Sequence, residues 1–128
     1  MSDEVGMMSG EPVRTDMLQR SKDLALRVIH LYSSLPKTVE AQVLGKQVLR
    51  SATSTGAHLR EGKRSRSTAE MISKTELAIQ ELDESLYWLE LLGESGIVKV
   101  EKLAGLITEM DELIAILVSS VKRMKGLR

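Results

Sequence analysis

The sequence predicts an all-α protein, an antiparallel up-and-down bundle of four helices. Apolar residues recur in steps of three and four along four segments, which is the spacing of one helical face. No stretch alternates between apolar and polar residues for long enough to form a strand. The segments are joined by short breaks, so consecutive helices should lie side by side and run in opposite directions. We expect a disordered tail over residues 1–14 and one bundle domain over residues 15–128.

The first two predicted helices are separated by a proline. The first occupies about residues 15–34 and ends at Leu35 and Pro36, because the residue before a proline is disfavoured in the helical conformation. The second begins near Thr38 and ends at Gly62, a residue type that is common just after a helix.

The third and fourth helices are bounded by caps and glycines. Ser67 and Glu70 have the spacing of a capping box, in which each side chain accepts a hydrogen bond from the backbone of the other. The apolar stripe of this helix continues until Gly93 and Gly96. Its predicted core residues are Ile72, Thr75, Ile79, Leu82, Leu86 and Leu89. The fourth helix is expected over about residues 100–124.

The fourth helix carries more apolar surface than one core requires. Residues 113–118 are apolar almost all round, and a helix of this kind must be buried all round. A wide core stripe with scattered surface residues is one interpretation. We favour a second buried face at a subunit interface, and hence a homo-oligomer. The candidate interface residues are Trp88, Leu91, Ile114 and Val118.

Composition removes several classes of function. The chain has no Cys, which excludes disulfides and thiolate metal sites. Its two histidines, His30 and His58, lack the Glu-x-x-His spacing of di-iron bundles, so we expect no metal. The stretch from Gly56 departs from a phosphate-binding loop, because five residues separate the glycines and Arg64 follows the lysine. We therefore expect no cofactor and no enzyme, in a cytoplasmic protein without a membrane span.

Charge is unevenly distributed, although 18 basic and 18 acidic residues give a formal net charge of zero. In an up-and-down bundle, the turn between helices two and three lies beside the end of helix four. The candidate nucleic-acid-binding residues at this end are Arg60, Lys63, Arg64, Arg66, Lys122, Arg123 and Lys125. Further bases from the chain termini and the first helix are Arg14, Arg20, Lys22 and Arg128. Bases at helix C-termini also complement the helix dipole, which is the alternative explanation for part of this set.

The second helix contains a run of small residues between charged ones. The residues of this motif are Arg50, Ser54, Gly56, Glu61 and Gly62. We expect the small residues to let a neighbouring helix approach closely, while Arg50 and Glu61 pair with charges on helix three. A ligand pocket lined by hydroxyls is the alternative.

The same residues carry a family resemblance. Residues 50–54 (Arg-Ser-Ala-Thr-Ser), 56–57 (Gly-Ala) and 61–62 (Glu-Gly) resemble the motif of the four-helix-bundle family first noticed as proteins encoded in 23S ribosomal RNA intervening sequences. Residues 87–92 (Tyr-Trp-Leu-Glu-Leu-Leu) are also similar to that family. The resemblance implies a ring-shaped homopentamer and supplies no catalytic residues. A related branch comprises accessory variability proteins of diversity-generating retroelements, which bind nucleic acid and a reverse transcriptase.

The resulting hypothesis is a non-enzymatic, homo-oligomeric accessory protein that binds RNA or DNA through its basic end, with a reverse transcriptase as a further candidate partner. The alternative is a scaffold that binds other proteins and no nucleic acid.

Overall fold

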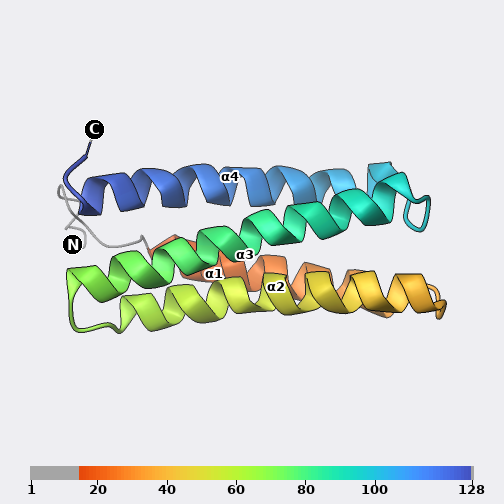
Figure 1. Ribbon diagram of the computed structural model, residues 1–128, viewed down its shortest axis with the longest axis horizontal. Helices are drawn as coiled ribbons and strands as arrows, with labels where there is room; N and C mark the ends of the chain where they lie inside the picture. Colours follow the sequence, from red (N-terminus) through yellow and green to blue (C-terminus); the bar gives the residue numbers. More distant parts are fainter. Residues whose placement is uncertain (1–14, 128) are drawn as a thin grey trace.

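Four long helices make up the part of the chain that the computed structural model describes, residues 15–127 (Figure 1). They are α1 (Thr15–Ser33), α2 (Val39–Lys63), α3 (Thr68–Glu94) and α4 (Val100–Met124). No strand occurs in these residues, so the predicted all-α class is confirmed. The predicted tail, residues 1–14, lies outside the described residues. No helix within residues 15–127 is both long enough and apolar enough to cross a membrane.

Consecutive helices run in opposite directions and pack against each other (Figure 1). The most extensive packing joins α2 to α3, and the least extensive joins α1 to α4, which closes the bundle. The start of α1, the turn between α2 and α3 and the end of α4 therefore meet at one end of the molecule (Figure 1). The predicted up-and-down order is confirmed, whereas the ring-shaped assembly stays a prediction.

The helix boundaries follow from local backbone chemistry. Thr38 caps α2 by accepting a hydrogen bond from the Ala41 N–H at 3.3 Å, and Ser67 caps α3 by accepting one from the Glu70 N–H at 3.1 Å. The expected reciprocal bond differs, because the Glu70 carboxylate accepts the N–H of Arg66 at 3.0 Å rather than that of Ser67. The cap thus fixes the backbone of the preceding turn as well as the helix start.

The core is aliphatic and is filled from all four helices. Its largest fully buried side chains are Met17, Leu24, Val28, Val48, Leu59, Leu82, Leu89, Leu92, Leu103, Met110, Leu113 and Leu117. The buried residues of α1, α2 and α4 mostly recur in steps of three and four, the spacing that the sequence analysis expects for one helical face. Isoleucines 107, 114 and 116 and Val118 of α4 are only half-buried within one chain.

The predicted core stripe of α3 is correct at Thr75, Leu82 and Leu89, which are buried, and wrong at its other three positions. Ile72, Ile79 and Leu86 are half-buried, while the buried positions between them include Ala78 and Ser85. Small residues allow two helix backbones to approach closely, so α3 turns its smallest side chains toward α2. The larger residues are displaced to the flank of the contact.

Small side chains line two sides of α2. On the α3 side, the Ser51 and Ser85 hydroxyl oxygens lie 2.6 Å apart, and both residues are fully buried. On the α1 side, a Cβ added at Gly56 would lie 3.2 Å from the Ser21 hydroxyl oxygen. These contacts show close approach of α2 to both neighbours, as the sequence predicted.

Candidate nucleic-acid interface

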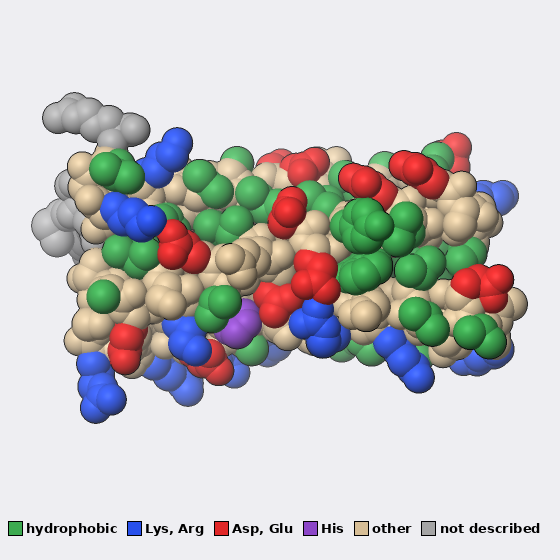
Figure 2. Space-filling view, in the orientation of Figure 1, with side chains coloured by type: hydrophobic (Ala, Val, Ile, Leu, Met, Phe, Trp, Pro, Cys, Tyr) green, Lys and Arg blue, Asp and Glu red, His purple; other side chains and the backbone are tan. Residues whose placement is uncertain are grey.

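Basic side chains project from the end of the bundle where α2, α3 and α4 meet (Figure 2, left). The backbone of the α2–α3 turn is held tightly there, because the Ser65 hydroxyl donates to the Gly62 carbonyl at 2.7 Å. This hydroxyl satisfies a carbonyl that has no partner within the helix. The turn therefore presents its bases from an ordered backbone. We call the following exposed residues the basic end: Arg60, Lys63, Arg64, Arg66 and Lys122.

The side chains of the basic end form no ion pair with any residue in the range 15–127. The nearby acids are engaged elsewhere. Glu61 lies 3.0 Å from the Lys74 ammonium on α3, and Glu70 accepts a backbone N–H. Bonding to Lys74 holds the pKa of the Glu61 carboxyl below its ordinary value. The positive charge at the turn is thus left without a partner inside the described part of the chain.

Two of the predicted basic residues at the end of α4 are engaged by the protein itself. The Lys125 ammonium lies 2.9 Å from a Glu76 carboxylate oxygen on α3, so this charge is neutralised within the bundle. Arg123 donates to the hydroxyls of Ser119 and Ser120 at 3.0 and 3.2 Å, which draws its guanidinium back along α4. Lys122 alone of the three remains without such a partner among the described residues.

Arg20, which the sequence assigned to the same positive end, forms a buttress between α1 and α4 instead. Its guanidinium contacts carboxylate oxygens of Glu109 and Glu112, each at 2.8 Å. These hydrogen bonds raise the pKa of Arg20, and the bond from Arg20 lowers the pKa of Glu109. The partners lie on the last helix of the chain, so only the antiparallel packing of α1 on α4 reveals the pair.

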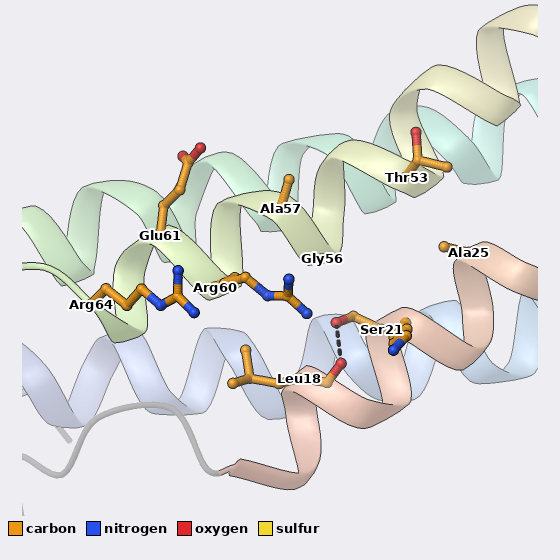
Figure 3. Close-up of a pocket in the computed structure, with 10 residues that line it drawn as sticks. Leu18, Ser21, Ala25, Thr53, Gly56, Ala57, Arg60, Glu61 and Arg64 are labelled. Carbon is orange, nitrogen blue, oxygen red and sulfur yellow. Dashed lines mark hydrogen bonds between the residues drawn. The ribbon is translucent and has the colours of Figure 1, made fainter.

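A groove of about 480 Å³ lies between α1 and α2 beside the basic end (Figure 3). Its lining residues are Leu18, Ser21, Lys22, Ala25, Thr53, Gly56, Ala57, Arg60, Glu61 and Arg64. The hydroxyls of Ser21 and Thr53 line it, as the pocket alternative anticipated. Both hydroxyl protons are already donated to backbone carbonyls, at 3.1 Å to Leu18 and 2.7 Å to Leu49. The sequence grouped Lys22 with Arg60 and Arg64 at one end of the bundle, and the structure brings them together on the two walls of this groove. Lys22 was not among the candidate nucleic-acid-binding residues, because its place opposite α2 depends on how α1 packs.

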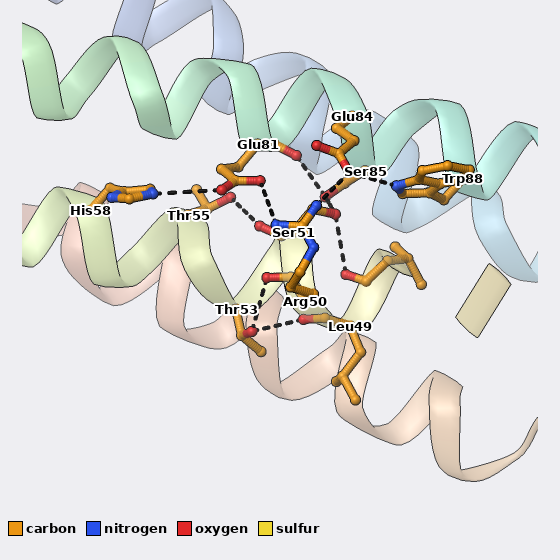
Figure 4. Close-up of polar contacts among 11 residues, drawn as sticks. Leu49, Arg50, Ser51, Thr53, Thr55, His58, Glu81, Glu84, Ser85 and Trp88 are labelled. Carbon is orange, nitrogen blue, oxygen red and sulfur yellow. Dashed lines mark hydrogen bonds and ion pairs between the residues drawn. The ribbon is translucent and has the colours of Figure 1, made fainter. Parts of the chain in front are cut away.

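The motif of α2 forms a polar clamp on α3 (Figure 4). Arg50 binds the carboxylates of Glu81, at 3.3 Å, and of Glu84, which also accepts the indole N–H of Trp88 at 3.1 Å. The bond from Trp88 and then that from Arg50 lower the pKa of Glu84. The predicted pairing of Arg50 with charges on helix three is confirmed, as is the pairing of Glu61 with Lys74.

Three other residues of this region are His58, Gly62 and Ser54. His58 lies between two carboxylates, with its ring nitrogens 3.7 Å from Glu61 and 3.5 Å from Glu81. Gly62 is buried, and a Cβ there would lie 3.2 Å from the Cβ of Lys74. Ser54 is half-buried, and its hydroxyl bonds to no described residue. The arrangement joins helices and offers no nucleophile paired with a base.

The four candidate interface residues are half-buried and lie on α3 and α4. Trp88 packs against Tyr87 with ring centroids 5.1 Å apart, and Tyr87 is 53% exposed. Val118 shares a groove with Ile79, which lies about 13 Å along α3 from Trp88 at 1.5 Å per residue. Figure 2 shows hydrophobic side chains gathered on this face.

No group of three or more His, Cys, Asp or Glu residues in the described chain could hold a metal ion.

Comparison with known proteins places the chain in a family. It matches the family described as 23S rRNA-intervening sequence protein over residues 14–119. Among solved structures it is similar to a protein with unknown function from the S23 ribosomal protein family of Bacteroides thetaiotaomicron VPI-5482. The two share 34% sequence identity and a TM-score of 0.78 over 83% of this chain and 98% of that one. No curated protein matches the chain. Because the family match covers all of α1 to α3 and most of α4, the chain belongs to the 23S rRNA-intervening sequence protein family.

Proposed function

We propose that this protein is a non-enzymatic, homo-oligomeric nucleic-acid-binding protein that contacts phosphates of RNA or DNA through its basic end. The observation that carries the proposal is the exposed, unpaired state of Arg60, Lys63, Arg64 and Arg66 beside acids that are already engaged. Cations without an intramolecular partner keep their full attraction for phosphate, whereas paired ones must first break a bond.

Helix capping alone does not account for these positions. Arg60 and Lys63 lie in the last turn of α2, where a base is favoured by the helix dipole. Arg66 directly precedes the N-cap of α3, where the dipole disfavours a positive charge. A charge held against the dipole is better explained by a partner outside the chain.

The expected contact is with the sugar-phosphate backbone rather than with bases. The chain has three aromatic residues, Tyr32, Tyr87 and Trp88, and none belongs to the basic end. Without rings to stack on unpaired bases, recognition depends on phosphate contact and nucleic-acid shape. The family description names 23S rRNA, which makes RNA the first ligand to test.

Self-association through α3 and α4 is the second part of the proposal. It is supported by the partly exposed Trp88, Leu91, Ile114 and Val118 together with the exposed Tyr87. An apolar area of this kind is typically covered in the functional state. Light scattering should give a mass above that of one chain, and a monomer at micromolar concentration would contradict this part.

Nucleic-acid binding is tested by fluorescence polarisation with labelled RNA and DNA, single-stranded and duplex, over a salt series. Affinity should fall steeply as salt rises, because each phosphate contact releases counterions. The variant with alanine at Arg60, Lys63, Arg64 and Arg66 should bind at least about tenfold more weakly at low salt.

The matched control changes four exposed lysines at the opposite end to alanine: Lys37, Lys46, Lys99 and Lys102. It alters the net charge equally and should retain most of the affinity. No binding of wild-type protein to RNA or DNA at low salt would refute the proposal and leave the protein-binding scaffold. Equal losses in the two variants would refute a role for the basic end.

A further inference from the structure

We propose that the groove between α1 and α2 is a discrete binding site for one phosphate group and the sugar attached to it. This inference rests on the proposed function, in that the phosphate belongs either to a bound nucleic-acid strand or to a free nucleotide. It adds a defined site, with chemistry supplied by two helices, to what is otherwise an extended basic surface.

The cations of the groove come from both of its walls. Arg60 lies in the last turn of α2, Arg64 follows that helix as its C-cap, and Lys22 lines the groove from α1. Figure 3 shows both guanidinium groups extended over the space between the two helices. None of the three side chains forms an ion pair or a hydrogen bond with a described residue. A guanidinium can bind phosphate oxygens through two parallel N–H donors, so this pair suits a phosphate better than a halide.

The acid in the lining does not cancel this charge. Glu61 points away from α1 (Figure 3) and lies 3.0 Å from the Lys74 ammonium on α3. Its carboxylate is thus balanced from the far side of α2. The remaining lining residues of α1, apart from Lys22, are uncharged: Leu18, Ser21 and Ala25.

The floor of the groove lies where small residues bring α1 and α2 together. A Cβ at Gly56 would lie 3.2 Å from the Ser21 hydroxyl oxygen, so a larger residue there would force the helices apart. The small side chain of Ala25 keeps the α1 wall low. The volume of about 480 Å³ is within the range of small-molecule sites and exceeds the needs of a bare phosphate.

The hydroxyls determine what can accompany the phosphate. Thr53 is half-buried and donates its proton to a backbone carbonyl, so its oxygen presents lone pairs to a further partner, whereas Ser21 is fully buried. Lone pairs repel a second phosphate and accept a hydrogen bond from a sugar hydroxyl. Along α2 the Thr53 acceptor lies about 10 Å before Arg60, so the order of groups on this wall fits a phosphate followed by a ribose.

The test compares two double variants that remove the same charge from the same end. Arg60→Gln with Arg64→Gln alters the groove, whereas Lys63→Gln with Arg66→Gln alters only the surface outside it. Binding of adenosine monophosphate is measured by calorimetry, and binding of a short single-stranded RNA by fluorescence polarisation. We expect a loss of about tenfold or more for the first pair and of no more than about threefold for the second.

A third variant separates shape from charge. Ala25→Leu places a branched apolar side chain in the groove from its α1 wall without changing the net charge. Its thermal unfolding should match that of the wild type, and its binding should fall about as far as that of the Arg60 and Arg64 pair. Leu at the exposed Ala104 of α4 is the matched control for the added side chain.

The outcomes show whether the groove binds a phosphate and which kind of molecule supplies it. Binding of adenosine monophosphate indicates a free nucleotide as ligand, and binding of RNA alone indicates a backbone phosphate; both support the site. Equal losses in the two double variants, or normal binding by Ala25→Leu, overturn the groove while leaving the basic end as a diffuse surface. If the wild type binds the mononucleotide but no RNA or DNA, the proposed function fails and the groove stands. Binding of neither ligand refutes both.

Discussion

The buried contact between Ser51 and Ser85 provides a quantitative test of how α2 and α3 are joined. The two hydroxyl oxygens are 2.6 Å apart, and Ser85 also donates to the Glu81 carbonyl at 2.8 Å. Because a hydroxyl has one proton, Ser51 must be the donor to Ser85. The alternative acceptor for Ser51, the Val48 carbonyl, lies at 3.4 Å, which is a weaker bond.

This proton order predicts the energies of a double-mutant cycle. Ser51→Ala leaves the Ser85 oxygen without its incoming bond, and Ser85→Ala leaves the Ser51 proton with only a distant acceptor. Each change should cost about 1 kcal/mol of unfolding free energy. The double variant removes both buried hydroxyls together and should cost little more than either single change. The expected coupling is therefore about 1 kcal/mol.

The assay is urea unfolding followed by circular dichroism, at one protein concentration because self-association would add to the apparent stability. Ser54→Ala on the same helix is the control and should change stability by less than about 0.5 kcal/mol. Additivity of the two single changes to within about 0.3 kcal/mol would refute the inferred bond between the helices.

Three further predictions concern the packing of the other helices. Leu82→Ala, at a fully buried core position, should cost about 2–5 kcal/mol in urea unfolding, and a loss below about 1 kcal/mol would contradict its place in the core. Ser67→Ala should cost about 1 kcal/mol through loss of the α3 cap, whereas Ser67→Asp should restore it. Glu109→Gln should cost about 1 kcal/mol at pH 7, because it weakens the pair with Arg20. Since the pKa of Glu109 is lowered in the folded protein, this difference should be complete above the unfolded value of about 4.3 and close as the pH falls below it; a constant difference down to pH 2 would count against the pair.

The helix boundaries could be predicted because they depend on local chemistry. Pro36 restricts the residue before it, and the hydroxyl of Ser67 reaches the N–H three residues later without help from any other helix. Such signals lie within a few residues of the boundary that they determine. The same holds for Gly96, which follows the end of α3 and has a φ of +81°, a conformation that favours glycine.

The orientation of α3 could be predicted only in part from the sequence, because its large apolar residues and its small residues favour different faces of the helix. The large side chains Ile72, Ile79 and Leu86 favour one stripe in the sequence. The closest packing in the bundle instead selects Ala78 and Ser85, which permit approach to α2. This face could have been identified by comparing the small residues of α2 with the small residues of α3, since close packing needs both.

The sequence predicted the ion pairs of the two charged motif residues of α2 and missed the others. Arg50 and Glu61 were identified from their spacing on the helix with the small residues. The pairs of Arg20 with Glu109 and of Lys125 with Glu76 depend on which helix faces join across the bundle. The sequence therefore overstated the unpaired positive charge at this end of the bundle. Among the described residues, that charge is reduced to the bases around the α2–α3 turn, Lys22 and Lys122.

The location of that remaining charge follows from an asymmetry in the neighbours of α2. On one side, α3 offers Glu81 and Glu84 to Arg50 and offers Lys74 to Glu61, so every motif charge that faces α3 is matched. On the other side, the part of α1 that lines the groove offers no acid. Arg60 and Arg64 lie on this second side and form no ion pair with the residues of α1 that line the groove. The same helix thus uses one face to hold the bundle together and leaves the other positive, which is the arrangement that a phosphate-binding surface requires.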